Sequence, residues 1–244
     1  MPRRVPVRAH ATGARLVSGA LLLACAAPAT AQVTLVDEGS FTVTRNGVRI
    51  GREEFSIRSA PGPTGTILFV AQASAVYDDR RLFPALSARP TGMPVSYQVE
   101  VRRGAEVEER WSGSFGAGRV SARITTPRRD AVREFLVADG ALLLDDDIFH
   151  QYFFVARRRG PAPLPVIAAR RNRQEFLHLV ERGTQTVDIG GQPLDASTFL
   201  ATGADGVERQ VWVDREARVL KVLVAAQGLM AVRDDPPPRI ESPR

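Results

Sequence analysis

The sequence predicts an all-β fold, in which a curved antiparallel sheet (a half-barrel or flattened barrel) packs against one helix. Apolar and polar residues alternate along many short segments, most clearly over residues 94–102. Only one segment, about residues 146–158, has helical spacing instead. Dipeptides typical of tight turns between paired strands recur at Asn46-Gly47, Asp139-Gly140 and Asp205-Gly206.

The N-terminal half is expected to form consecutive hairpins. Residues 40–45 and 48–58 flank Asn46-Gly47, and both turn residues tolerate the positive φ of a type I′ turn. Residues 78–92 contain Pro84, Pro90 and Gly92, so we expect a long connection there. Further strands are expected at 66–77, 94–102, 107–115, 119–126, 131–137 and 141–144, the last two joined as a hairpin at Asp139-Gly140.

The helix prediction rests on the spacing of five apolar residues. They recur at i, i+1, i+4, i+5 and i+8, at Ile148, Phe149, Tyr152, Phe153 and Ala156. The acids at 145–147 are expected to cap the helix N-terminus, and Gly160-Pro161 to end it. A metal site of Asp146 or Asp147 with His150 is the alternative. Three consecutive acids lack the spacing of an EF-hand loop, so we expect no metal.

Strands resume after this helix and continue almost to the C-terminus. They are expected at 166–170, 175–181, 184–189, 196–201, 207–213 and 218–226. Residues 234–244 contain three consecutive prolines and are expected to be a disordered tail. No linker divides residues 32–233, which we therefore expect to form one antiparallel β domain.

Residues 1–31 have the order of a secretory signal peptide. Four arginines precede the apolar run 16–27, and Ala29-Thr30-Ala31 resembles a cleavage site before Gln32. The protein is therefore expected to be exported, either periplasmic or secreted. In an alternative interpretation, residues 22–25 form a lipobox and the mature protein is anchored through an acylated Cys25.

Composition restricts the classes of partner. Residues 1–31 hold four of the 33 basic residues and none of the 27 acidic ones, so the remaining chain is nearly balanced in charge. Such a chain does not favour nucleic acid, which requires a basic face. Beyond the signal peptide, no apolar run is long enough for a transmembrane helix. Cys25 is the only cysteine, so cleavage after Ala31 would remove every thiol.

Sequence patterns that indicate catalysis are missing. A Ser-His-Asp arrangement could use His150 or His178, but no Gly-x-Ser-x-Gly segment is present. His178, between Phe176 and Val180, is expected to be a hydrogen-bonded structural residue. We therefore expect a protein that is not an enzyme and has no cofactor.

Large aromatic residues are the candidate ligand-binding residues. Those expected to line a cavity are Tyr97, Trp111, Phe149, Phe153 and Trp212. Ordinary core packing is the alternative for each of them. An arginine cluster, which could meet anionic lipid head groups or form only a solvated rim, comprises Arg157, Arg158, Arg159, Arg170, Arg171 and Arg173.

The order of strands and helix resembles secreted bacterial β-rich families of unknown function and, more remotely, the lipoprotein-localisation half-barrels. The segments that carry this resemblance are the 46–51 hairpin, the helix at 145–158 and the closing strands 211–214 and 219–222. It covers most of residues 39–226. In the half-barrel family a curved sheet with a helical lid holds acyl chains, and no ligand-binding residue of that family matches a position here.

Two functions from different classes follow. The first is a non-catalytic cell-envelope protein that binds a lipid or another hydrophobic or amphiphilic ligand. The second is a structural or assembly partner of other envelope proteins, without a small ligand. A deep apolar concavity would favour the first, and an exposed edge strand with apolar side chains would favour the second.

Overall fold

The computed structural model describes residues 32–239. The predicted signal peptide, Cys25 and the last five residues lie outside this range. Within it, one sheet contains the strands β1 (Thr34–Arg45), β2 (Val48–Pro61), β3 (Ile67–Tyr77), β4 (Arg80–Ala88), β5 (Pro94–Arg103), β6 (Glu106–Gly116), β7 (Arg119–Thr126), β8 (Arg129–Leu136), β9 (Leu142–Leu143), β10 (Leu164–Ala168), β11 (Arg173–Ile189), β12 (Gln192–Thr202), β13 (Glu208–Val213), β14 (Val219–Val224) and β15 (Leu229–Arg233). A short 3₁₀ turn, Ala225–Gln227, joins β14 to β15.

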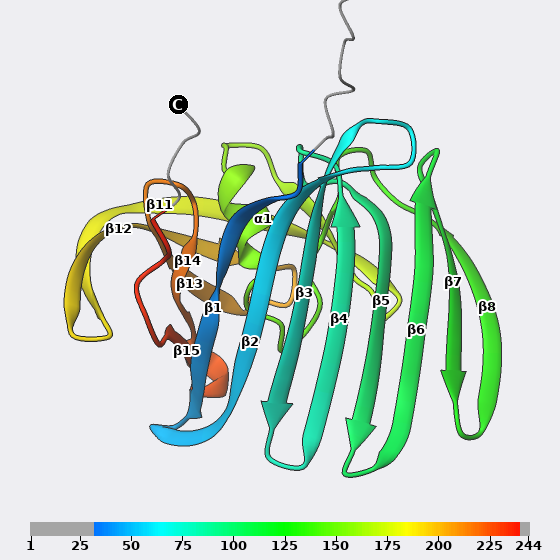
Figure 1. The fold of residues 1–244 in the computed structure, drawn as a ribbon, viewed down its shortest axis with the longest axis horizontal. Coiled ribbons are helices and arrows are strands. Elements are labelled where there is room, and N and C mark those ends of the chain that lie inside the picture. Colours follow the sequence, from blue (N-terminus) through cyan, green and yellow to red (C-terminus); the bar gives the residue numbers. More distant parts are fainter. Residues whose placement is uncertain (1–31, 240–244) are drawn as a thin grey trace, which may run out of the picture. The chain divides into compact units, whose positions relative to one another are not determined.

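The sheet is an open, curled meander, which confirms the predicted fold class. Its strand order runs from β8 through β1 to β15 and on to β9, so β8 and β9 are its two edges. Pairing is antiparallel throughout, except that β9 runs parallel to β10. The first and last strands of the chain, β1 and β15, pair with each other, and Phe41 lies opposite Arg233, 192 residues later in the sequence. This β1–β15 contact joins the two halves of the meander into one curved wall (Figure 1).

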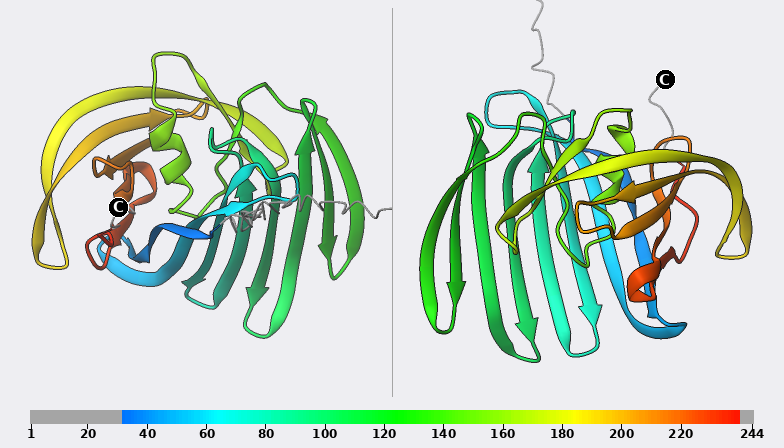
Figure 2. Two further views of the ribbon diagram at one scale, coloured as in Figure 1. Left: turned by 45° about the horizontal axis from the view of Figure 1, so that its top comes forward. Right: turned by 180° about the vertical axis from the view of Figure 1, so that it is seen from behind.

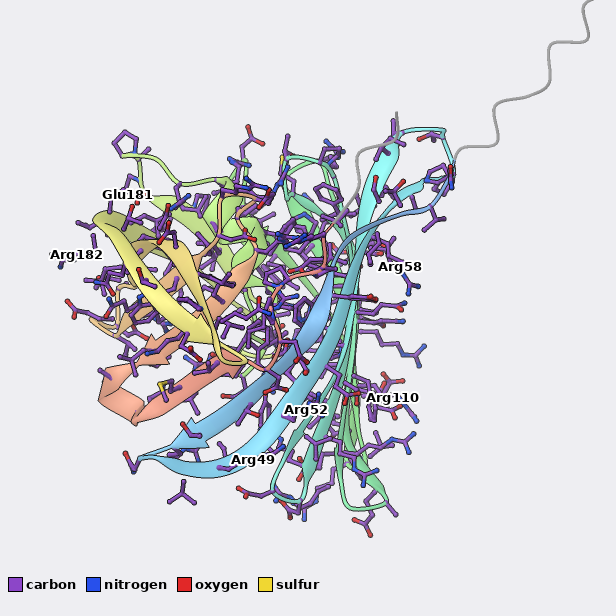
Figure 3. All side chains as sticks on the ribbon, turned by 60° about the vertical axis from the view of Figure 1, so that its left-hand side comes forward. Arg49, Arg52, Arg58, Arg110, Glu181 and Arg182 are labelled. Carbon is purple, nitrogen blue, oxygen red and sulfur yellow. The ribbon has the colours of Figure 1, made fainter. Side chains whose placement is uncertain are left out.

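Alternation along the strands places the core on the inner face. In β5, Tyr97, Val99 and Val101 are buried, whereas Ser96 and Gln98, which alternate with them, are exposed. The outer face of the same wall is polar, and Arg58 and Arg110 project from it into solvent (Figure 3). This wall therefore has one apolar face, around which the sheet can curl, whereas β11 to β14 bury a second apolar cluster on their other face.

The one α-helix within residues 32–239, α1 (Tyr152–Arg157), lies inside the curl, as predicted. Figure 2 shows it between the β1–β6 wall and the long β11–β12 hairpin that curves past it. The ring centroid of Phe153 is 6.1 Å from that of Phe69 on β3. On the other side, the Arg159 guanidinium lies 5.3 Å from the ring centroid of Phe199 on β12. Through Phe153 in the helix and Arg159 just beyond its C-cap, this segment contacts both walls.

The predicted bounds of the helix, about 146–158, are wrong. The helix spans only six residues, Gln151 occupies its N-cap without a side-chain hydrogen bond, and no acid lies in its first turn. Asp147 has a φ of 58°, which ends any helical continuation on the N-terminal side. Asp145 and Asp146 pair with Arg170 and Arg171 instead of capping the helix, and the backbone carbonyl of Asp147 accepts a hydrogen bond from Tyr77, so residues 145–150 form a non-helical segment before α1.

Three strand predictions also need correction. Residues 80–88, expected to be a connection, form the strand β4. Proline has no N–H to donate, and β4 tolerates Pro84 because neither Phe83 nor Pro84 has a partner on β3. Asp139-Gly140 does not join a hairpin, because β9 pairs with β10. The two strands expected at 175–181 and 184–189 are one strand, β11, with a bulge between Glu181 and Gly183.

The start of the expected disordered tail makes specific contacts. Asp234 accepts hydrogen bonds from the hydroxyls of Ser40 and Thr42, each at 2.6 Å. The Arg218 guanidinium donates to the Pro238 carbonyl at 2.6 Å. Residues 234–238 therefore lie against β1 and the β13–β14 turn.

Candidate functional site

A buried carboxylate on β2 holds the loop that precedes α1. One oxygen of Glu53 accepts the backbone N–H of Phe149 at 2.7 Å, and the other accepts the N–H of His150 at 3.0 Å. The ring Nδ1 of His150 lies 2.6 Å from the same carboxylate, and both side chains are fully buried. The His150 ring also stacks on Phe55. Glu53 thus fixes residues 149 and 150 against the inner face of the sheet.

A second buried carboxylate fixes the other end of this loop. Asp145 accepts hydrogen bonds from the Tyr97 hydroxyl at 3.0 Å and from Nε of Arg170 at 2.8 Å. The side chains of Asp145 and Arg170 are 0% and 8% exposed, so little water screens this ion pair. Burial, followed by the charge of Asp145, raises the pKa of Tyr97 well above its ordinary value, so the phenol stays a donor.

The fixed loop separates two cavities. We call the first the hairpin cavity: it has a volume of about 220 Å³ and lies beside the β1–β2 and β3–β4 turns. Its lining residues are Val43, Arg45, Ile50, Tyr77, Asp78, Asp79, Arg80, Arg103, Asp147, Phe149 and Leu229. The second, the loop cavity, has a volume of about 130 Å³ and lies between residues 144–149 and strands of the second half, β10 to β15. Asp147, Phe149 and Leu229 line both.

Asp147 is the most unusual residue at this junction. Its backbone has a positive φ, which costs a non-glycine residue conformational energy. Its carbonyl accepts a hydrogen bond from the Tyr77 hydroxyl at 2.8 Å. Within the described residues, its carboxylate forms neither a hydrogen bond nor an ion pair. Burial raises the pKa of Asp147, and this exceeds the opposing effect of Arg170.

Asp147→Asn should stabilise the protein at neutral pH. The ordinary pKa of an aspartate is 3.8 and the folded-state pKa of Asp147 is higher, so ionisation above that pKa costs folding free energy. Asparagine removes this cost and tolerates positive φ. The gain in urea-unfolding free energy should shrink as pH falls through the raised pKa and be absent below about pH 3.8.

Asp130→Asn provides a control in which the expected change in stability has the opposite sign. The hydrogen bonds from Arg123 lower the pKa of Asp130, so this carboxylate contributes stability that is lost as pH falls. Its substitution should lower stability slightly at pH 7. A stability gain for Asp147→Asn that does not change with pH would contradict the assigned burial cost.

Tyr97 and Trp111 border two larger hollows, of about 550 and 580 Å³, and one of the five predicted ligand-binding residues lies at the hairpin and loop cavities. Phe149 lines both of them. Tyr97, Trp111 and Phe153 belong to the main packed core, where Tyr97 and Trp111 have ring centroids 5.6 Å apart. Trp212 belongs to a separate apolar cluster, and its indole N–H donates to Gln185 at 3.0 Å. The structure therefore does not bring the five aromatic residues together around one cavity.

His150 and the predicted arginine cluster make structural contacts, whereas His178 does not lie where it was predicted. His150 contacts Glu53 and not the acids at 145–147, and no group of three metal-ligand side chains occurs within residues 32–239. His178 is exposed on β11 and not in the core. Most of the arginine cluster is engaged in contacts: Arg170 with Asp145, Arg171 with Asp146, Arg173 with Glu175 and Arg157 over the ring of Phe153. Arg158 donates to a backbone carbonyl, and Arg159 lies near Glu181.

Comparison with solved structures finds a protein of similar fold. A crystal structure described as a beta-barrel-like protein of a domain of unknown function, DUF1849, from Brucella abortus superposes with a TM-score of 0.56. The two sequences are 10% identical over 84% of this chain and 98% of that chain. The likeness is one of fold. No protein-family model matches the sequence, and no curated protein matches it.

Glu53 and Tyr77 are the site residues that sequence reasoning missed. Glu53 shares the inner face of β2 with Phe55 and Ile57, so a carboxylate on an otherwise apolar face was the available signal. Tyr77 ends β3 and carried no such signal. Among the described residues, no helix is both long and apolar enough to cross a bilayer.

Proposed function

We propose that this protein is an exported, non-catalytic cell-envelope protein that binds a small amphiphile at the hairpin and loop cavities. The N-terminal signal-like segment supports export. The observation that carries the binding proposal is the junction at Asp147, where an unpaired, partly buried carboxylate lies beside apolar walls.

The apolar walls suit the non-polar part of a ligand. Val43, Phe149 and Leu229 are buried core residues that also line the hairpin cavity. The loop cavity continues from Phe149 and Leu229 to further core side chains, among them Val166 and Leu177. Apolar lining with a few convergent polar groups is the usual composition of a ligand site.

The polar rim favours a cationic head group. Asp147 and Asp78 have no ion-pair partner within the described residues, and neither has Arg45. Asp79 and Arg103 neutralise each other at 2.7 Å. The unpartnered charges are therefore two carboxylates and one guanidinium. A ligand amine beside Asp147 would compensate the burial that raises the pKa of this carboxyl.

Size limits the ligand to a single chain. Ligand sites commonly have volumes of about 300–1,000 Å³, and each cavity is smaller than that. Cavities of this size suit one alkyl chain with a compact head, whereas a two-chain phospholipid is too large.

Isothermal titration with three twelve-carbon probes tests the proposal. Dodecylamine, dodecanol and dodecanoic acid, each below its aggregation concentration, share a chain and differ in charge. The amine should bind most tightly and the acid most weakly. Asp147→Asn should weaken amine binding about tenfold, which is about 1.4 kcal/mol, and leave the alcohol unchanged.

Two variants separate the chain from the head group. Ile50→Gln places an amide in the wall of the hairpin cavity and should weaken all three probes. Asp195→Asn, at an exposed position of β12 that lines neither cavity, should leave the binding of all three probes unchanged. Failure of all three probes to bind the wild-type protein would overturn the amphiphile proposal. Equal amine affinity in wild type and Asp147→Asn would overturn the role of Asp147.

A further inference from the structure

The edge strand β8 presents unpaired backbone along one side. It contains eight residues, pairs only with β7, and has no register shift or proline. Thr126 and Arg129 flank a two-residue turn and pair with each other. Because hydrogen-bonded pairs alternate in an antiparallel ladder, the backbones of residues 129, 131, 133 and 135 bond to β7. The N–H and C=O groups of residues 130, 132, 134 and 136 therefore point away from the sheet.

The side chains of this edge strand are unusual for a surface. Val132 and Leu136 are each 70% exposed, the highest values among the exposed large apolar residues. Both lie on the outer face, on the same side as Glu134. Proteins commonly protect an edge with proline, a bulge, very short length or charged side chains, and β8 has only the last of these, at Arg129, Asp130, Arg133 and Glu134.

We propose that β8 is a docking site for an extended segment of another protein, which adds to the sheet as a further antiparallel strand. The unpaired backbone groups require a strand as the occupant, because only an extended chain offers matching donors and acceptors at the same spacing. Alternate side chains of that segment would face Val132, Glu134 and Leu136. The segment should therefore carry an apolar, a basic and an apolar residue on one face.

Charge disfavours a second copy of this chain as the occupant. Two β8 strands from two copies could pair antiparallel in two registers that use nearly the whole strand and place both outer faces on the same side of the combined sheet. One places Arg133 opposite Arg133, and the other places Asp130 opposite Glu134. Like charges directly opposite each other destabilise a strand pair, so β8 favours a different chain.

Hydrogen exchange with a synthetic peptide tests this surface. The probe alternates valine and lysine on one face, and a control peptide carries N-methyl groups on the amides that would pair with β8. In the free protein the amides of Val132, Glu134 and Leu136 should exchange rapidly, while those at 131, 133 and 135 are protected. The probe should slow exchange at 132, 134 and 136 at least tenfold, and the methylated peptide should not.

Proline substitution separates docking from folding. Val132→Pro removes an outward N–H and should lower probe affinity at least tenfold with little change in the melt, because edge strands tolerate proline. Arg133→Pro removes an inward N–H and should destabilise the β7–β8 hairpin. Equal probe binding to wild type and Val132→Pro would overturn the proposal. Amides at 132 and 134 already protected in free protein would also overturn it, and protection that grows with protein concentration would indicate a second copy.

Discussion

Asp145→Ala should lower the free energy of unfolding by about 3–5 kcal/mol, the usual cost of removing one partner from a buried ion pair. The substitution leaves Arg170 charged and almost fully buried, and it leaves the Tyr97 hydroxyl without its acceptor. Because Asp145 also fixes the loop between the two cavities, binding of dodecylamine should weaken in the same variant. Urea unfolding monitored by circular dichroism measures the first effect, and titration of the folded protein measures the second.

Glu181→Ala is the matched control for this loss. It removes the exposed carboxylate that lies 3.4 Å from the Arg159 guanidinium. Exposed ion pairs contribute about 0–1 kcal/mol, so this variant should unfold close to the wild type. Similar losses for the two variants would show that the burial of Asp145 does not determine its contribution.

Phe153→Ala should also lower the free energy of unfolding by about 3–5 kcal/mol, because it deletes a buried aromatic side chain from a packed core. The Phe153 ring is 1% exposed, contacts Phe154 edge-on at 5.3 Å and lies beneath the Arg157 guanidinium. It lines neither the hairpin cavity nor the loop cavity. Amphiphile binding by the folded variant should therefore remain within about twofold of wild type.

Phe176→Ala on β11 is the control, since this ring is 45% exposed. This substitution should lower the free energy of unfolding by about 1 kcal/mol or less. If Phe153→Ala instead melted like the wild type and lost probe binding, the helix would be a ligand lid and not part of the core. Retention of both wild-type melting and wild-type binding would contradict packing of α1 against the sheet.

Most of the first half of the sheet was predictable, because each strand there has one apolar face and a local turn. Asn46-Gly47 adopts positive φ at both residues, as a type I′ turn requires. The strand β4 was missed because Pro84 indicates a loop when read alone. Only the three-dimensional pairing shows that its missing N–H falls at a break in the β3–β4 ladder.

The candidate site was less predictable, because its contacts join distant parts of the chain. Glu53 and His150 lie 97 residues apart in sequence, and Asp145 and Arg170 lie 25 apart. Local propensity assigns the three acids to a helix N-terminus. For Asp145, the buried ion pair with Arg170 outweighs that preference, because leaving the Arg170 charge buried and unpaired would cost more free energy than a helix cap provides.

The sequence by itself determined the all-β class, the early hairpins, the apolar inner face and the presence of one buried helix, since periodicity and turn chemistry act over a few residues. The tertiary structure decided the length of that helix, the pairing of β1 with β15, the two cavities at Asp147 and the unpaired edge of β8. These features depend on which distant segments come into contact when the sheet curls, and the spacing of residues along the chain does not predict those contacts.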